Sequence, residues 1–174
     1  WERLGIVENA KKNRFCKMFP HKISIIKDYK YSVYIDGNIK PVADFTEFIN
    51  KIGNSGIALH LHSSRECVYE EAKVCVFSGK ETKDNVEAHM RFLRNNNFPE
   101  HYGMLECNLI ARDHSNPTMQ KLMTMWWDEF CNHSKRDQLS FPYVLFKNGI
   151  EVRDVGTLGN NIYADYAVRI VKHE

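Results

Sequence analysis

Three segments of the chain have the apolar pattern of buried β-strands. Residues 31–35 are aromatic and β-branched, contain no Gly or Pro, and are soon followed by a Gly-Asn turn. Residues 57–62 and 104–112 alternate apolar and polar positions, which is the two-residue period of a strand. Residues 151–156 form a short fourth candidate. We therefore expect a sheet at the centre of the protein.

Helical periodicity fills most of the chain between these strands. Apolar residues recur every three or four positions in four segments, namely 44–52, 65–78, 82–96 and 117–130. Asn116 can cap the last of them, and Pro117 suits its first helical position. Further helices are expected at 15–19, after a capping Ser134, and at 160–172. The two consecutive helices in mid-chain indicate the helical insert of one α/β domain.

The composition is that of a globular protein. Of the 174 residues, 43% are hydrophobic and 26% are charged, which argues against disorder. A net charge of +2 gives no basic field for nucleic acid, and no apolar run is long enough to span a membrane. The N-terminus lacks a signal-peptide core, and five cysteines without a C-x-x-C pair indicate reduced thiols. We expect a cytoplasmic protein, in a bacterium or in the host cell of a virus.

Asp36 directly follows the strand at 31–35. In open α/β sheets ligands bind beyond the carboxyl ends of strands, so a carboxylate here is expected to belong to a site. An Asp-Gly pair between apolar runs is also a strong hairpin signal, and local spacing alone favours that interpretation. On the strand at 104–112, alternation places Glu106, Asn108 and Arg112 on one polar face. Such a face is either a wet edge or the lining of a site.

Polar residues also gather on two expected helices. Arg136, Asp137 and Gln138 stand near a helix N-terminus, where free N–H groups recognise oxygen-rich ligands. Ordinary capping would equally account for Asp137. Arg14 and Lys17 share the polar face of the first helix, and they can either hold phosphate or remain solvated.

His60 and His62 stand two residues apart on one expected strand, so their imidazoles point to the same face. Histidines at this spacing can share a metal ion, although a packed pair without metal is the commoner arrangement. No third ligand follows at a metal-binding spacing.

Four pieces of the chain occur in the order found in nucleotide-sugar-dependent glycosyltransferases of the GT-A type. They are Ile-Asp-Gly-Asn at 35–38, the polar strand at 106–112, the Trp-Trp pair at 126–127 and the Asp-Gln pair at 137–138. In these enzymes an acidic motif after a strand holds a divalent metal on the diphosphate, and a later strand lines the sugar pocket. The chain thus resembles this class in the order and spacing of several motifs.

The resemblance is closest to one glycosyltransferase-like domain family, formerly of unknown function, that includes capsular-polysaccharide proteins and plant mucilage and turgor-regulation proteins. The matching blocks are Asn-Arg-x-x-Lys-x-x-Pro-His-Lys at 13–22, Tyr-Ser-x-x-Ile-Asp-Gly-Asn at 31–38, His-x-x-Arg-x-Cys-x-Tyr-x-Glu at 62–71, Glu-x-Asn-x-x-x-Arg-x-His at 106–114 and Ser-Lys-Arg-Asp-Gln-Leu-Ser-Phe at 134–141. The resemblance implies one GT-A-like domain over residues 1–174, with a mixed, mostly parallel sheet flanked by helices.

The resemblance implies a reaction that moves a sugar from a nucleoside-diphosphate sugar, favouring a UDP-sugar, to a glycan or glycoprotein acceptor. Asp36 would bind Mn²⁺ or Mg²⁺ with help from Asn38, and His114 is a further candidate metal ligand. Arg14 and Lys17 would hold the phosphates. Similarity to glycogenin-like and xyloglucan-xylosyltransferase-like enzymes favours retention of the anomeric configuration.

The remaining roles concern the donor sugar. Asp137 and Gln138 would orient its hydroxyls, and Glu106 is a further catalytic candidate. Arg112 and Arg136 would steady the carboxylates. The same blocks also contribute two candidate pocket residues, His62 and Arg65.

Two features depart from the family pattern. The expected N-terminal strand and glycine-rich turn are missing before the first block, so we expect either a fragment of a longer chain that can carry further domains or a replaced N-terminus. The acidic motif is Asp-Gly-Asn rather than Asp-x-Asp, which predicts weak metal binding before the nucleotide arrives.

Three other classes stay open on sequence grounds. A metal-dependent hydrolase would use His60, His62 and Asp36 as ligands. A non-catalytic carbohydrate-binding domain would bind glycan without turnover of a donor. A purely structural α/β domain would tolerate the loss of Asp36.

Overall fold

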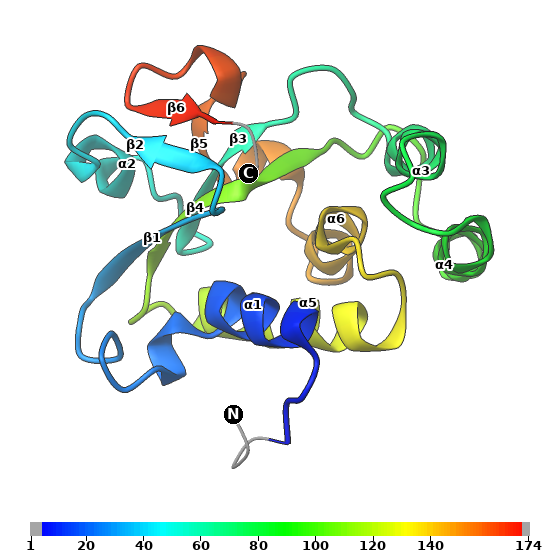
Figure 1. Cartoon of the computed structure of the whole chain (residues 1–174), viewed down its shortest axis with the longest axis horizontal. Coiled ribbons are helices and arrows are strands. Elements are labelled where there is room, and N and C mark those ends of the chain that lie inside the picture. Colours follow the sequence, from blue (N-terminus) through cyan, green and yellow to red (C-terminus); the bar gives the residue numbers. More distant parts are fainter. Residues whose placement is uncertain (1–4, 172–174) are drawn as a thin grey trace.

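The computed structural model describes residues 5–171 and shows a central sheet with helices on both sides (Figure 1). The sheet has four strands in the order β1, β4, β3, β5. Their bounds are Tyr31–Ile35 for β1, Leu105–Asp113 for β4, Ile57–Leu61 for β3 and Gly156–Gly159 for β5. The first three strands confirm the sequence-based expectation.

The fourth strand begins later than expected. A short 3₁₀ turn, η3 (Val152–Asp154), occupies half of the expected strand at 151–156, and β5 begins only at Gly156. A side chain at Gly156 would place its Cβ within 2.8 Å of the Ile57 carbonyl oxygen. The Cβ would lie still closer to the Lys51 carbonyl oxygen and the Gly53 nitrogen, so only a glycine lets the backbone pass here.

Strand directions correct the expectation of a mostly parallel sheet. β4 is antiparallel to both of its neighbours, β1 and β3, and only the pairing of β3 with β5 is parallel. Three strands therefore run in one direction, and the reversed β4 lies between two of them. The sheet is mixed, as expected, but its pairings are mainly antiparallel.

An irregularity in β4 changes which residues share a face. Leu59 of β3 pairs with Ile110, whereas the next residue, His60, pairs with Glu106. Odd-numbered residues of β4 therefore face one core before the irregularity and the opposite core after it. The expectation that Arg112 lies on the same face as Glu106 is wrong for this reason.

A second, two-stranded sheet was not expected from the sequence. Strand β2 (Ile39–Pro41) pairs antiparallel with β6 (Val168–Ile170). The expected closing helix at 160–172 is wrong within the described residues, since only a 3₁₀ turn, η4 (Ile162–Ala164), and β6 occur there. Strands of three residues are too short to show a period, which is why neither was detected.

The helices form layers on the two faces of the main sheet (Figure 1). One face packs against α1 (Asn9–Met18), α5 (Pro117–Asn132) and α6 (Asp137–Lys147), and the other against α2 (Thr46–Asn50) and the β2–β6 pair. The expected helical insert is confirmed as α3 (Val68–Phe77) and α4 (Lys83–Asn95), which share a separate apolar cluster with α6. The first helix ends before a 3₁₀ turn, η2 (Pro20–Lys22).

Two helix starts determine where the polar residues lie. Asn116 caps α5 as expected, its Oδ1 accepting from the backbone N–H groups of Thr118 and Met119. The expected Ser134 cap of α6 is wrong: Arg136 takes the N-cap position, and Ser134 Oγ accepts from the Arg136 N–H. The helix consequently begins at Asp137.

Candidate functional site

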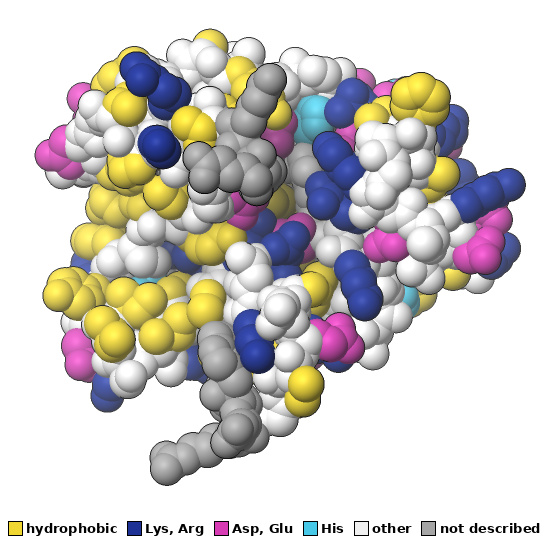
Figure 2. All heavy atoms as spheres, in the orientation of Figure 1, with side chains coloured by type: hydrophobic (Ala, Val, Ile, Leu, Met, Phe, Trp, Pro, Cys, Tyr) yellow, Lys and Arg dark blue, Asp and Glu magenta, His cyan; other side chains and the backbone are white. Residues whose placement is uncertain are grey.

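A polar cavity of about 260 Å³ lies where the carboxyl end of β1 meets α1, α6 and β4. Figure 2 shows basic and acidic side chains meeting in a recess near the centre of this face. Most of the side chains singled out from the sequence line this cavity: Arg14, Lys17, Asp36, Asn38, Glu106, Arg136, Asp137 and Gln138. Residues from four distant blocks of the chain thus form one site.

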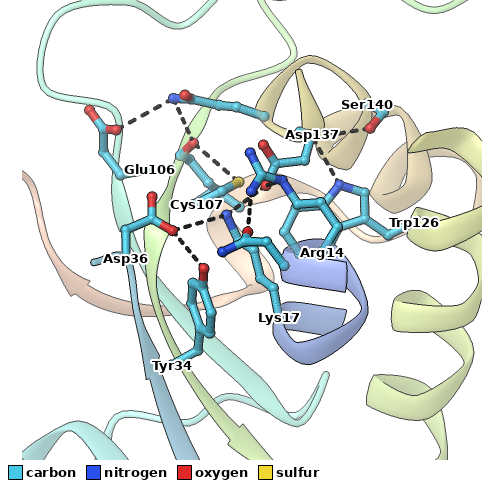
Figure 3. A network of polar contacts seen from close by, with 12 residues as sticks. Arg14, Lys17, Tyr34, Asp36, Glu106, Cys107, Trp126, Asp137 and Ser140 are labelled. Atoms are coloured by element: carbon cyan, nitrogen blue, oxygen red, sulfur yellow. Dashed lines mark hydrogen bonds and ion pairs between the residues drawn. The ribbon is translucent and has the colours of Figure 1, made fainter. Parts of the chain in front are cut away.

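Lys17 joins the two acidic groups of the site. Its Nζ lies 2.6 Å from Asp137 Oδ2 and 3.9 Å from Asp36 Oδ1, and its side chain is 2% exposed. Figure 3 shows Lys17 reaching from α1 into the space between the two carboxylates. A buried ammonium in this position holds Asp137 close to Asp36, because moving Asp137 away would leave the buried Lys17 without its nearest partner.

Asp137 is a buried carboxylate held by two cations. Besides Lys17, Arg14 Nε lies 3.2 Å from Asp137 Oδ2. Burial alone would raise the pKa of Asp137, but Lys17 and Arg14 outweigh it, and the pKa lies below its ordinary value. The Trp126 indole Nε1–H donates to the Asp137 carbonyl over 2.8 Å, which ties the start of α6 to α5. Asp137 is therefore charged and fixed in place.

Asp36 is the more accessible of the two carboxylates. Its side chain is 34% exposed, and its Oδ1 accepts a hydrogen bond of 2.7 Å from the Tyr34 hydroxyl. Burial raises the pKa of Tyr34, and the neighbouring Asp36 raises it further, so this hydroxyl stays a donor. The Asp36 backbone N–H donates to the Asn108 carbonyl of β4, which anchors the turn to the sheet.

Glu106 and Gln138 lie on the β4 side of the cavity. Gln138 Nε2 donates to the Leu105 carbonyl over 3.2 Å and to Glu106 Oε2 over 3.4 Å. Glu106 Oε1 lies 3.8 Å from His62 Nε2. An amide and a carboxylate side by side offer both a donor and acceptors for sugar hydroxyls.

His62 and Arg65 do not line the same cavity as Asp36. Both belong to a neighbouring cavity of about 610 Å³ next to the start of α3. Arg65 donates from Nε to Glu71, and His62 Nδ1 accepts from the Arg65 backbone N–H over 3.0 Å. His62 and Arg65, expected to line the pocket with the other candidate residues, therefore line a different cavity.

His114 is the clearest correction among the candidate ligands. Its Nε2 lies 2.7 Å from Ser32 Oγ, near the beginning of β1, whereas Asp36 follows the end of the same strand. The two side chains are separated by the length of β1, because β4 runs antiparallel to it. His114 cannot join Asp36 in one metal site.

The residues that fit a divalent cation are few. Asp36 and Asn38 both face the cavity, and their oxygens suit Mn²⁺ or Mg²⁺. Within residues 5–171, no group of three His, Cys, Asp or Glu side chains is arranged to hold a metal ion. Two ligands fit a cation whose other ligands are diphosphate oxygens and water, as Mg²⁺ commonly has.

The expected histidine pair does not converge on one ligand. His60 Nε2 lies 2.7 Å from Asp165 Oδ2, in the segment between β5 and β6, whereas His62 lies beside Glu71 and Glu106. Burial is the main reason that the pKa of His60 is lowered. The arrangement gives no support to a hydrolase that uses both histidines and Asp36 as ligands.

Sequence reasoning missed three residues that line the cavity, one of which is Cys107 of β4. Lys80 comes from the turn between α3 and α4, and Tyr163 from η4. Tyr163 is 66% exposed. Neither residue belongs to a recognisable motif, and both reach the cavity only through long-range packing.

The mixed sheet, the flanking helices and a charged cavity beyond the end of a strand define an α/β domain of the ligand-binding type. Residues 4–170 match the family model described as "TOD1/MUCI70, glycosyltransferase-like domain", so the chain belongs to this glycosyltransferase-like family. This confirms the family suggested by the sequence blocks.

Comparison with curated proteins and with solved structures gave no match. No helix among residues 5–171 has the length and apolar character needed to cross a membrane.

Proposed function

We propose that this domain transfers a sugar from a nucleoside-diphosphate sugar to a glycan, with the polar cavity as the donor site. Membership of a glycosyltransferase-like family supports a transferase. The observation that carries the proposal is the Lys17 bridge, which places Asp36 and Asp137 on one cavity although 101 positions separate them in the sequence numbering. A structural domain has no need of a charged, open arrangement of this kind.

The leaving diphosphate requires cations, and the cavity supplies both a buried cation and more exposed ones. Lys17 is buried and already paired with Asp137, so we assign it to positioning rather than to phosphate binding. Arg14 is more exposed and also lies at the cavity. Lys80 and Arg136 line the cavity too, and neither forms an ion pair with a carboxylate in the described part of the chain. Their charges are available to the diphosphate.

Asp36 and Asn38 would hold Mn²⁺ or Mg²⁺ together with the diphosphate. The bound cation would supply Lewis-acid stabilisation of the leaving group. Because Lys17 Nζ lies 3.9 Å from Asp36 Oδ1, the same carboxylate faces both this ammonium and the proposed ligand position. The two-ligand set predicts that metal and nucleotide bind together.

Asp137, Gln138 and Glu106 would contact the donor sugar and the acceptor hydroxyl. Both cations that hold Asp137 contact its Oδ2, which leaves Oδ1 to accept from a sugar hydroxyl. In the reaction the acceptor oxygen forms a bond to the anomeric carbon, and the bond to the diphosphate oxygen breaks with its electron pair. The acceptor proton passes to Glu106, the carboxylate on the β4 side of the cavity.

A thermal-shift titration tests the proposal. We expect UDP, GDP or UDP-glucose to stabilise the protein only with Mn²⁺ present. A ligand at about 100 times its Kd should raise Tm by roughly 5–10 °C, from about 2.7 kcal/mol of linkage and about 2–4 °C per kcal/mol. The Asp36→Ala variant should lose this response while keeping a cooperative transition.

The matched control is Asp28→Ala. The Asp28 side chain is 82% exposed, and its one ion pair among the described residues is with Lys27, so this variant should respond like the wild type. Release of UDP from UDP-glucose, measured alongside, separates a transferase from a binding domain. Stabilisation by nucleotide that survives Asp36→Ala, or none with any nucleotide, would contradict the assignment of the cavity.

A further inference from the structure

The larger cavity beside the donor site has no role in the function proposed above. Its volume of about 610 Å³ lies within the range of about 300–1,000 Å³ that small-molecule sites occupy. Three segments, 61–66, 101–104 and 151–153, form it. The first begins at the end of β3, and the second precedes the start of β4. None of these segments takes part in the Asp36–Lys17–Asp137 arrangement.

A side-chain contact between His62 and Glu106 joins the walls of the two cavities. His62 lines the larger cavity, Glu106 lines the donor cavity, and His62 Nε2 lies 3.8 Å from Glu106 Oε1. The His62 side chain is 5% exposed, which places it within the wall rather than on the surface. A ligand in the larger cavity would therefore end beside the carboxylate that faces the donor sugar.

The floor of the larger cavity is held in place by Gly103. Its φ is +103°, and a Cβ at this position would lie 2.9 Å from Val152 Cβ. Its backbone N–H donates to the Glu66 carbonyl over 2.9 Å, which joins two of the three segments. The cavity is therefore a built feature of the fold, since only glycine permits this conformation and this close approach.

The charges around the cavity are already paired. His101 Nδ1 lies 3.2 Å from Glu66 Oε1, Arg153 Nε lies 2.7 Å from Glu151 Oε2, and Arg65 donates to a buried carboxylate of α3. A charged ligand would compete with the existing partner of one of these groups. A neutral ligand rich in hydroxyls would instead find donors and acceptors side by side, as each hydroxyl both donates and accepts.

We propose that the larger cavity binds a neutral oligosaccharide, which is the acceptor of the transfer reaction. The His62–Glu106 contact then marks the point where the acceptor hydroxyl meets the donor sugar. The ring of Tyr102, another residue of the cavity wall, supplies an apolar surface for a pyranose face. The acceptor role rests on the proposed function, whereas the binding of glycan does not require it.

A steric block tests the site. Ser64 lines the cavity, is exposed, and has only a 3.3 Å contact with Ser63 Oγ through its side chain, so Ser64→Trp should fill the cavity without unfolding the protein. Ser63→Trp is the matched control, because Ser63 is exposed next to the cavity but does not line it. Arg153→Ala is a second test variant. Because the Arg153 side chain is 79% exposed, its replacement should not affect folding.

The probes are hexasaccharides of glucan, mannan, xylan and galactan, with oligogalacturonate as the charged comparison, measured by calorimetry with UDP and Mn²⁺ present. We expect the wild type and Ser63→Trp to bind at least one neutral probe equally well. Ser64→Trp should weaken that binding at least tenfold, and Arg153→Ala several-fold. The thermal response to UDP and Mn²⁺ should be the same in all four proteins.

Equal glycan affinity in Ser64→Trp and Ser63→Trp would overturn the location of the site. Binding of oligogalacturonate alone would overturn the neutral class, and binding of no neutral probe to the wild type would overturn the proposal. A failure of the proposed function has a different signature, namely glycan binding that Ser64→Trp abolishes without any response to UDP in the wild type.

Discussion

The two ends of β1 place buried charges in opposite surroundings. At the cavity end, next to Asp36, the buried Lys17 has a carboxylate 2.6 Å away and a second one 3.9 Å away. At the other end, which we call the sealed end, the buried residues are Arg112 and His114, with His21 beside them. Arg112 forms no ion pair in the described part of the chain and donates from Nη1 to the Lys17 carbonyl.

This difference is visible in the pKa values. Burial lowers the pKa of Arg112 to about 9. Burial also lowers the pKa of His21 to about 4, with smaller contributions from Lys22, His114 and Arg112. At the cavity end, cations keep the pKa of Asp137 below its ordinary value despite burial. Nearby cations outweigh burial for Asp137, whereas no carboxylate offsets the effect of burial on Arg112 and His21.

The largest effect is expected for Lys17→Met. The change keeps the length of the side chain but leaves Asp137 buried with one fewer cation. Removing one partner of a buried ion pair costs about 3–5 kcal/mol, so we expect the free energy of unfolding to fall by that amount. Urea denaturation followed by tryptophan fluorescence measures it.

Lys12→Met serves as the control for this variant. Lys12 lies on the same helix and has no ion pair among the described residues, so its replacement should cost less than about 0.5 kcal/mol. The double variant Lys17→Met with Asp137→Leu should recover part of the loss, because both charges are then absent. A Lys17→Met protein as stable as the wild type would refute the buried pair.

The second prediction concerns Arg112→Met, at the sealed end. Removing this buried cation leaves no buried carboxylate without a partner. It also removes the free-energy cost of burying a charge. The loss of its hydrogen bond to Lys17 O works in the other direction by about 1 kcal/mol. We expect a net change within about 1 kcal/mol of the wild type by the same measurement. A loss near that of Lys17→Met would erase the contrast between the two ends.

The smallest effect is expected from the titration of His21. Its folded-state pKa lies below the ordinary 6.5, so the unfolded chain takes up a proton first as the pH falls. Stability is therefore present above about pH 6.5 and is lost as the pH falls toward 4. His21→Phe should show a shallower decline in the urea midpoint across this window.

The size of the His21 effect should be roughly 1 kcal/mol or less, since the ring is partly exposed and screened. Asp137 gives the complementary window: its lowered pKa adds stability above the ordinary value of 3.8, and this stability is lost only below it. An identical pH profile for His21→Phe and the wild type between pH 6.5 and 4 would show that His21 remains solvated.

The sequence predicted the local structure of the donor cavity well. The bounds of β1, the cap of α5 and the polar start of α6 follow from short patterns that need no distant contact. Most polar side chains of the cavity were also identified, since they belong to blocks that resemble the family. Their roles in binding and catalysis stay predictions.

The placement of side chains relative to one another was less predictable. His62 and Arg65 line the second cavity, and His114 lies at the sealed end, because the pairing of β4 sets their positions. The irregularity in β4 turned Arg112 away from Glu106, and alternation alone could not show it. Lys80 and Tyr163 reach the donor cavity only through packing across the chain.

By itself the sequence therefore determined the longer helices, the three central strands and most of the polar residues that belong together chemically. The tertiary structure decided strand direction, the β2–β6 pairing and the division of the polar residues between two cavities. The physical reason is that periodicity records which face of one segment is buried, whereas register and direction depend on backbone hydrogen bonds between segments far apart in the chain.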